Sequence, residues 1–199
     1  KEISAVLKDA NLGSAPIIIG HSFGGLMTMR FAAHHGEQVG GVIIVDSPVL
    51  PESEKSSAAP RRALSVSRHY PTFEIGLERF RLLPKQECQN QFIVEFIARH
   101  SLRETISGWT WKFDVAAMGS RRWAEPFEEH LHNMKCRSAL IVADNSAIVS
   151  SVTAQYMSDL MGPESPMTTI EDSHHHIMLD QPFRFIDAVK KILHDWDLK

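Results

Sequence analysis

The segment Gly20-His21-Ser22-Phe23-Gly24 constrains the fold of this chain more than any other. The apolar run Pro16–Ile19 before it predicts a short buried strand, and residues 26–33 after it have the apolar spacing of a helix. A chain that passes from strand to helix so quickly must turn sharply, so the positions two before and two after the serine need almost no side chain. The pattern predicts a strand–turn–helix unit that holds a strained serine above the end of the strand.

The rest of the chain alternates between apolar strands and helices. Apolar runs predict further strands at Gly41–Val45 and within Ser138–Ala143, and Met167–Ile170 is expected to form a fourth strand. Helical stretches are expected over residues 1–11, roughly 121–134, 150–161 and 182–196. Strands without polar alternation, separated by helices, are typical of a parallel sheet that is covered on both faces. The predicted fold class is therefore α/β, with a mostly parallel sheet flanked by helices.

Residues 51–111 interrupt this alternation. They open with a polar loop and contain helical stretches around 73–81 and 86–100, but no convincing strand. We expect a helical cap over the carboxyl-terminal edge of the sheet, inserted between a core of residues 1–50 and a core of residues 112–199. The alternative is a set of extra helices packed beside the sheet.

Composition excludes several classes of protein. Lys and Arg total 21 against 24 Asp and Glu, so no basic excess indicates nucleic acid or a membrane surface as a partner. The longest apolar runs are only strand-sized. Cys88 and Cys136 lie far apart, which argues against a disulfide framework or a thiolate zinc site and favours the reducing cytoplasm. Residues 1–11 carry no helix N-cap, so we expect the chain to begin within a fold, and a targeting signal cannot be assessed.

The strand, the Gly-x-Ser-x-Gly turn and the following helix resemble the α/β-hydrolase superfamily, in its serine-hydrolase branch. The resemblance covers essentially the whole chain, but only the C-terminal part of that fold. It implies a larger, mostly parallel sheet whose first strands would precede Lys1. It also implies that Ser22 is the nucleophile and that the backbone N–H of Phe23 helps to stabilise an oxyanion, with a second donor located upstream.

The same resemblance indicates the general base. Family members place this histidine after the last strand, seven residues before a proline that opens the final helix, which here identifies His175 ahead of Pro182. His174 and His176 flank it, so a metal site was the alternative interpretation. Neighbouring side chains on an extended loop point in different directions, however, and no carboxylate or thiolate accompanies them at ligand spacing. We therefore expect neither a metal nor another cofactor.

The third member of the triad has two candidates. The family usually carries its acid just after the strand that follows the cap, where this chain has Ser146 and Ala147 at the expected positions. Asp144 is the nearest carboxylate there, but it lies one or two positions early. Some members carry the acid after the preceding core strand, which here is Asp46. We favour Asp46, keep Asp144 as the alternative, and leave open that no acid is present.

Aromatic residues cluster where the predicted cap rejoins the core. Trp109, Trp111 and Phe113 alternate along an extended segment and would share one side of it, as the wall of a substrate pocket would require. Simple packing of these rings against neighbouring elements is the alternative.

The resulting prediction is a serine hydrolase that cleaves a small or medium ester, or a related acyl or C–C bond, through an acyl-enzyme intermediate. Its partner would be a small ester-like molecule, and assembly into a homo-oligomer is left open. One alternative is an α/β-hydrolase-like protein that binds a ligand or acts as a scaffold without turnover. Another is a split protein that folds only with a partner supplying the missing strands.

Overall fold

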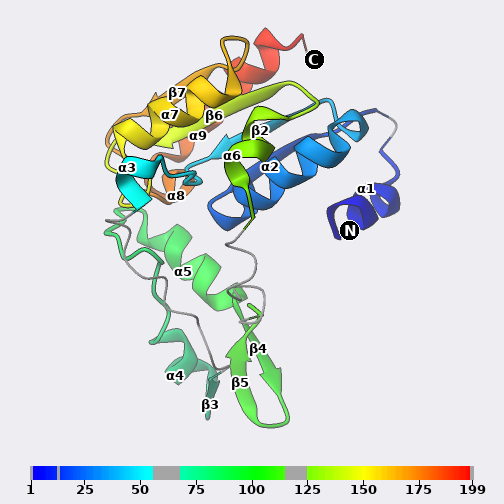
Figure 1. Cartoon of the computed structure of the whole chain (residues 1–199). Helices are drawn as coiled ribbons and strands as arrows, with labels where there is room; N and C mark the ends of the chain where they lie inside the picture. Colours follow the sequence, from blue (N-terminus) through cyan, green and yellow to red (C-terminus); the bar gives the residue numbers. More distant parts are fainter. Residues whose placement is uncertain (1, 13, 56–67, 115–124, 198–199) are drawn as a thin grey trace. The chain divides into compact units, whose positions relative to one another are not determined.

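A computed structural model describes residues 2–12, 14–55, 68–114 and 125–197 (Figure 1). The chain divides into two compact units. The first contains residues Lys1–Ser57 and Pro126–Lys199, and the second contains Ala58–Glu125. The first unit therefore includes the polar segment at 51–57, which the sequence had placed in the inserted region.

The first unit is built on a four-stranded sheet in the order β1-β2-β6-β7. The strands are β1 (Ile17–His21), β2 (Gly41–Val45), β6 (Ser138–Ala143) and β7 (Met167–Ile170), and each neighbouring pair is parallel. The expected mostly parallel sheet is thus confirmed. Because all four strands run the same way, the residues that follow their carboxyl ends meet at one edge of the sheet.

Helices cover both faces of this sheet, as continuous apolar strands require. On one face, α2 (Phe23–His35) contacts β1, β2 and α6 (Phe127–His132), and α6 in turn contacts α7 (Ser151–Met161) (Figure 1). On the other face, α9 (Pro182–Asp195) packs Ala188 and Ile192 into a buried cluster with the strand residues. That cluster consists of Ile43, Val45, Ala139, Ile141, Ala143, Ile170, Ile177, Ala188, Ile192 and Trp196.

Three short elements and one amphipathic helix complete this unit. They are α1 (Glu2–Ala10), the 3-10 turn η1 (Gly36–Gln38), α3 (Glu52–Lys55) and α8 (Ile177–Asp180). The carboxylate of Glu54 in α3 accepts hydrogen bonds from the hydroxyls of Ser150 and Thr153 at the start of α7. The loop after β2 is thereby fastened to the first turn of α7.

The second unit contains short strands in addition to the helices expected for residues 51–111. It holds α4 (Phe73–Leu77) and α5 (Gln91–His100), and also an antiparallel sheet in the order β3-β5-β4. These strands are β3 (His69–Tyr70), β4 (Leu102–Thr105) and β5 (Gly108–Trp111). They are short, and β4 is mostly polar, so they lack the apolar pattern that reveals a strand. The role of this unit as a cap stays a prediction. In the described part of both units, no helix is long and apolar enough to cross a membrane.

Candidate active site

Ser22 occupies the turn between β1 and α2 in a backbone conformation that side chains rarely adopt. Its φ is 55° and its ψ is −122°, which is a strained combination for a residue other than glycine. The turn is held on both sides: the Ser22 N–H donates to Val45 O on β2, and Ser22 O accepts from the N–H groups of Gly25 and Leu26. These hydrogen bonds hold the backbone of Ser22, and with it the point from which the side chain projects.

The three glycines around Ser22 differ in how much space they leave for a side chain. A Cβ on Gly20 would lie 2.4 Å from Thr28 Oγ1, and one on Gly25 would lie 1.9 Å from Ser47 Oγ. At Gly24 an added Cβ meets nothing within 4 Å. The expectation that the residues two before and two after the serine must lack side chains therefore holds for Gly20, whereas the second close approach is at Gly25 instead of Gly24.

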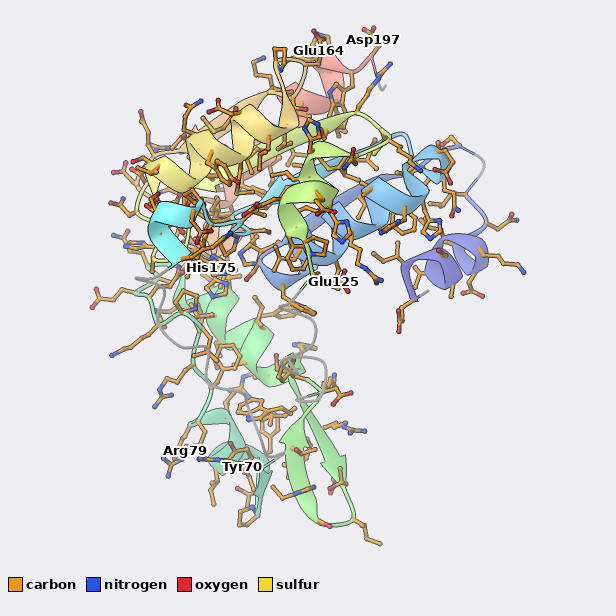
Figure 2. All side chains as sticks on the ribbon, in the orientation of Figure 1. Tyr70, Arg79, Glu125, Glu164, His175 and Asp197 are labelled. Atoms are coloured by element: carbon orange, nitrogen blue, oxygen red, sulfur yellow. The ribbon has the colours of Figure 1, made fainter. Side chains whose placement is uncertain are left out.

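His175 lies in the loop between β7 and α8 (Figure 2) and forms hydrogen bonds through both ring nitrogens. Nε2 lies 2.9 Å from Ser22 Oγ, and Nδ1 lies 2.8 Å from Asp46 Oδ2. A carboxylate can only accept, so Nδ1 carries the proton and Nε2 presents its lone pair to the serine hydroxyl. The side chains of His175 and Asp46 are 1% and 0% exposed, so this arrangement is shielded from water.

Asp46 directly follows β2 in a left-handed conformation with φ 42°. Its Oδ1 accepts from the backbone N–H of Ala143, and its Oδ2 accepts from Ser146 Oγ at 2.6 Å as well as from His175. Three donors from separate segments of the chain thus hold one buried carboxylate. This is the network that an ionised buried acid needs in order to keep its charge.

Ser146 is a residue whose importance the sequence did not reveal. While its hydroxyl donates to Asp46, the oxygen accepts from the N–H groups of Ile148 and Val149 at 3.2 and 3.0 Å. The direction of its hydroxyl proton is therefore set by the loop after β6. The signal in the sequence was a serine at a position where the resemblance leads one to expect an acid.

Asp144, the alternative acid, holds the backbone of the histidine loop. Its carboxylate accepts from the N–H groups of Asp172 and Ser173. Desolvation raises the pKa of Asp144, but the backbone N–H bonds from Ser173 and Asp172 outweigh it and leave the pKa below its ordinary value. The structure therefore brings Asp46, and not Asp144, against the ring of His175.

His21 is a second residue that sequence reasoning did not single out. It ends β1, and its Nε2 lies 2.8 Å from the backbone oxygen of His175, to which it can only donate. Burial, followed by the nearby imidazole of His175, lowers the pKa of His21 to about 4. The ring is therefore neutral at pH 7 and links the serine turn to the histidine loop.

The remaining predicted site residues are placed as follows. Phe23 is the first residue of α2, and its role as an oxyanion donor stays a prediction. Trp109 and Trp111 lie in β5 of the second unit, where their rings contact Phe73 and Tyr70 with centroids 4.9 and 5.7 Å apart. Phe113 follows β5 and is exposed. The described contacts are those of packing within that unit, and a pocket wall stays a prediction.

Comparisons with known proteins give the family and the fold. A family model described as the alpha/beta hydrolase family matches residues 2–188. The solved structure of an E-2-(acetamidomethylene)succinate hydrolase aligns with a TM-score of 0.76 at 16% identity, over 97% of this chain and 71% of that one. A thioesterase domain from the curacin biosynthetic pathway gives 0.70 at 16% identity, over 96% and 71%.

A third solved structure, the esterase Rv0045c from Mycobacterium tuberculosis, gives a TM-score of 0.64 at 23% identity, over 97% of this chain and 65% of that one. The chain therefore spans about two thirds of the length of these structures. A comparison with curated protein sequences finds no match. With a family model that extends over nearly its whole length, the chain belongs to the alpha/beta hydrolase family.

Proposed function

We propose that this chain is a serine hydrolase that cleaves a small or medium ester, or a related acyl or C–C bond, through an acyl-enzyme intermediate. The observation that carries the proposal is the continuous hydrogen-bonded series from Ser22 Oγ through the His175 ring to Asp46 Oδ2, with steps of 2.9 and 2.8 Å. A nucleophile that bonds its base, and a base oriented by a third group, is the arrangement needed to activate a weakly acidic hydroxyl. Membership of a hydrolase family supports the same class of reaction.

In the first half of the reaction, Ser22 Oγ attacks the carbonyl carbon of the substrate while its proton passes to His175 Nε2. The carbonyl π electrons move to the oxygen and form a tetrahedral oxyanion, toward which the Phe23 N–H is proposed to donate. Collapse of this species expels the alcohol or other leaving group, which takes the proton from His175. The acyl group then remains bonded to Ser22 Oγ.

In the second half, His175 removes a proton from water, and the resulting hydroxide attacks the acyl carbon. The tetrahedral species collapses, Ser22 Oγ regains the proton from His175, and the carboxylic acid leaves. Asp46 accepts the Nδ1–H bond throughout, so it keeps the ring in the required tautomer and stabilises the imidazolium that forms twice in each cycle.

The substrate class is proposed from chemistry and from the neighbours in fold. Solved structures that are similar to this chain include an esterase, a thioesterase domain and an E-2-(acetamidomethylene)succinate hydrolase. A small ester-like molecule is therefore the proposed substrate, with Trp109, Trp111 and Phe113 as the proposed apolar wall. The proposed location is the cytoplasm, where the free thiols of Cys88 and Cys136 would stay reduced.

Active-serine labelling tests the proposal directly. The protein, in the form that its cells make, is treated with a fluorophosphonate probe, and the adduct is located by peptide mass spectrometry beside a Ser22→Ala control. We expect an adduct on Ser22 that is absent from the control, together with turnover of nitrophenyl esters of short or medium acyl length. A folded protein that neither reacts with the probe nor turns over any ester would contradict the proposal and favour a ligand-binding protein without catalysis.

A further inference from the structure

Three histidines from two parts of the chain meet beside the candidate nucleophile. A ligand nitrogen of His21 at the end of β1 and one each of His175 and His176 in the loop after β7 all lie within 4.8 Å of one another. The ring centroids of His21 are 4.5 and 5.3 Å from those of His175 and His176. Among the residues that the structure describes, this is the one group of three or more possible metal ligands found.

This cluster differs from the metal site considered in the sequence. The sequence argues against a site made of the adjacent histidines 174–176, because neighbouring side chains on an extended loop point apart. The structure keeps His174 out of the group, since that side chain is 48% exposed and bonds Asp180. The third imidazole comes instead from the position before the nucleophile, through the return of the loop after β7 to the end of β1.

The protonation states of the cluster suit a metal ion. His175 donates Nδ1–H to the carboxylate of Asp46, which leaves the lone pair of Nε2 directed away from the acid. A histidine whose second nitrogen donates to a carboxylate is the arrangement that orients metal-binding imidazoles. His21 donates its Nε2–H to the backbone oxygen of His175, which leaves a lone pair on its Nδ1.

We propose that His21, His175 and His176 bind a divalent transition metal ion, with Zn²⁺ as the best match, and that the bound ion inhibits the hydrolase. Imidazole nitrogens are ligands that zinc prefers, and three protein ligands with one open position form a common zinc site. Two nitrogens bound to a tetrahedral zinc ion lie about 3.3 Å apart, so ligand nitrogens that are at most 4.8 Å apart need to approach one another by about 1.5 Å or less.

Inhibition is expected because the metal ion and the proton of Ser22 need the same lone pair, that of His175 Nε2. The His175 Nε2 that would bind zinc is the atom that lies 2.9 Å from Ser22 Oγ and accepts its proton in the proposed reaction. An ion on this nitrogen and a hydrogen bond from Ser22 exclude each other. This second half of the proposal rests on the proposed function, whereas the binding of the ion does not.

Zinc binding is measured first without any reaction. Isothermal titration of the Ser22→Ala variant with zinc chloride is expected to show one ion bound per chain. Adding His176→Asn is expected to raise the Kd for zinc at least about tenfold, whereas adding His174→Asn, a matched change two positions earlier in the same loop, should alter it by less than about twofold. Circular dichroism checks folding, and His21→Asn replaces His176→Asn if the latter does not fold.

Labelling then tests inhibition in the unaltered chain. Zinc is expected to slow the fluorophosphonate reaction of Ser22, and a chelator should restore it. If the Ser22→Ala variant binds no zinc, or if His174→Asn weakens binding as much as His176→Asn does, the metal site is wrong. If zinc binds as expected but leaves labelling of Ser22 unchanged, inhibition is wrong. Zinc binding to a chain that the probe never labels would support the metal site and count against the proposed function.

Discussion

Ser146 Oγ donates a 2.6 Å hydrogen bond to Asp46 Oδ2, the same oxygen that accepts from the ring of His175. The two residues follow neighbouring parallel strands, β6 and β2, and are a hundred positions apart in the chain. The two places at which a triad acid was expected are therefore in direct contact. In this chain one of them holds the carboxylate and the other holds a hydroxyl that binds it.

The first prediction distinguishes Asp46 from Asp144. Asp46→Asn keeps the size and the left-handed backbone but removes the negative charge that fixes the Nδ1–H tautomer, so kcat should fall about 10⁴-fold. Asp144→Asn should leave kcat within about threefold and lower the free energy of unfolding by about 1 kcal/mol, because Asp144 accepts from backbone N–H groups of the histidine loop and from the side-chain amide of Asn145, and not from the His175 ring. Ester hydrolysis and urea unfolding of both variants measure these effects, and an equal loss of kcat in both would contradict the assignment.

The second prediction gives Ser146 a positioning role. Ser146→Ala removes one of the three donors to the Asp46 carboxylate, and we expect kcat to fall about tenfold with little change in KM, since the residue acts through Asp46 and His175. Ser146→Thr keeps the hydroxyl and should restore most of the rate. Steady-state kinetics on one nitrophenyl ester separates the two constants. A change confined to KM, or a threonine variant as slow as the alanine variant, would show that the hydroxyl does not serve the acid.

The sequence predicted the main sheet because that information is local. β2 and β6 coincide with apolar runs, and such runs persist only where both faces of a strand are buried. β1 extends past its apolar run, since Gly20 and His21 continue to pair with Ile44 and Val45. The small sheet of the second unit was missed because β3 has two residues and β4 is mostly polar.

The candidate site was less predictable, because the contacts of two of its residues, Ser146 and His21, depend on how distant segments are brought together in the fold. Ser22 and His175 could be located from the turn motif and from the distance to Pro182 along the chain. The contact of Ser146 with Asp46 exists only because β6 pairs directly with β2. His21 likewise meets His175 only through the return of the loop after β7 to the first strand. No periodicity in a single sequence reports which strands are neighbours.

The third prediction concerns the glycines of the serine turn. Gly20→Ala and Gly25→Ala each introduce a Cβ that would overlap a hydroxyl and lie 2.8 Å from a backbone oxygen, so we expect each to lower the free energy of unfolding by about 1–3 kcal/mol or more. Gly24→Ala meets open space within the first turn of α2 and should leave stability unchanged or raise it by up to about 1 kcal/mol. Urea unfolding of the three variants compares them. Equal destabilisation by Gly24→Ala would mean that the turn is packed differently.

The fourth prediction is a pH dependence of stability. The pKa of His21 is lowered to about 4, first by burial and then by its electrostatic interaction with His175, whereas the unfolded chain has the ordinary value of 6.5. Between these values the unfolded chain binds a proton that the folded chain does not, so stability present above pH 6.5 is lost as the pH falls toward 4. The loss reaches about 3 kcal/mol at pH 4.

His21→Gln removes this proton linkage while an amide N–H can still donate to the backbone oxygen of His175. Urea unfolding at pH 7.5 and pH 4.5 should therefore show a decrease in the free energy of unfolding that is smaller in the variant, by about 2–3 kcal/mol. A decrease of the same size in both proteins would show that His21 titrates normally in the folded state.

The fifth prediction exchanges the two contacting positions. In the Asp46→Asn variant, the added change Ser146→Asp places a carboxylate at the end of β6, the neighbouring strand. It would lie next to the position that Asp46 Oδ2 occupies in the unaltered chain, where that oxygen binds His175. The amide introduced at position 46 still accepts from the Ala143 N–H and can donate to the new carboxylate. Ser146 Oγ lies 2.6 Å from the Asp46 oxygen that binds His175 Nδ1, and an aspartate side chain is longer than that of serine, so we expect the new oxygens to reach His175 Nδ1.

Asp46→Asn alone is expected to lower kcat about 10⁴-fold. We expect the double variant to have a kcat about a hundredfold higher than that of Asp46→Asn. Recovery must depend on the charge, so Asp46→Asn combined with Ser146→Asn serves as the matched control and should remain as slow as the single variant. Pre-steady-state release of nitrophenol gives the acylation rate for all three proteins. A double variant no faster than its control would mean that the end of β6 cannot place an acid against His175, and that the acid role belongs to the β2 position alone.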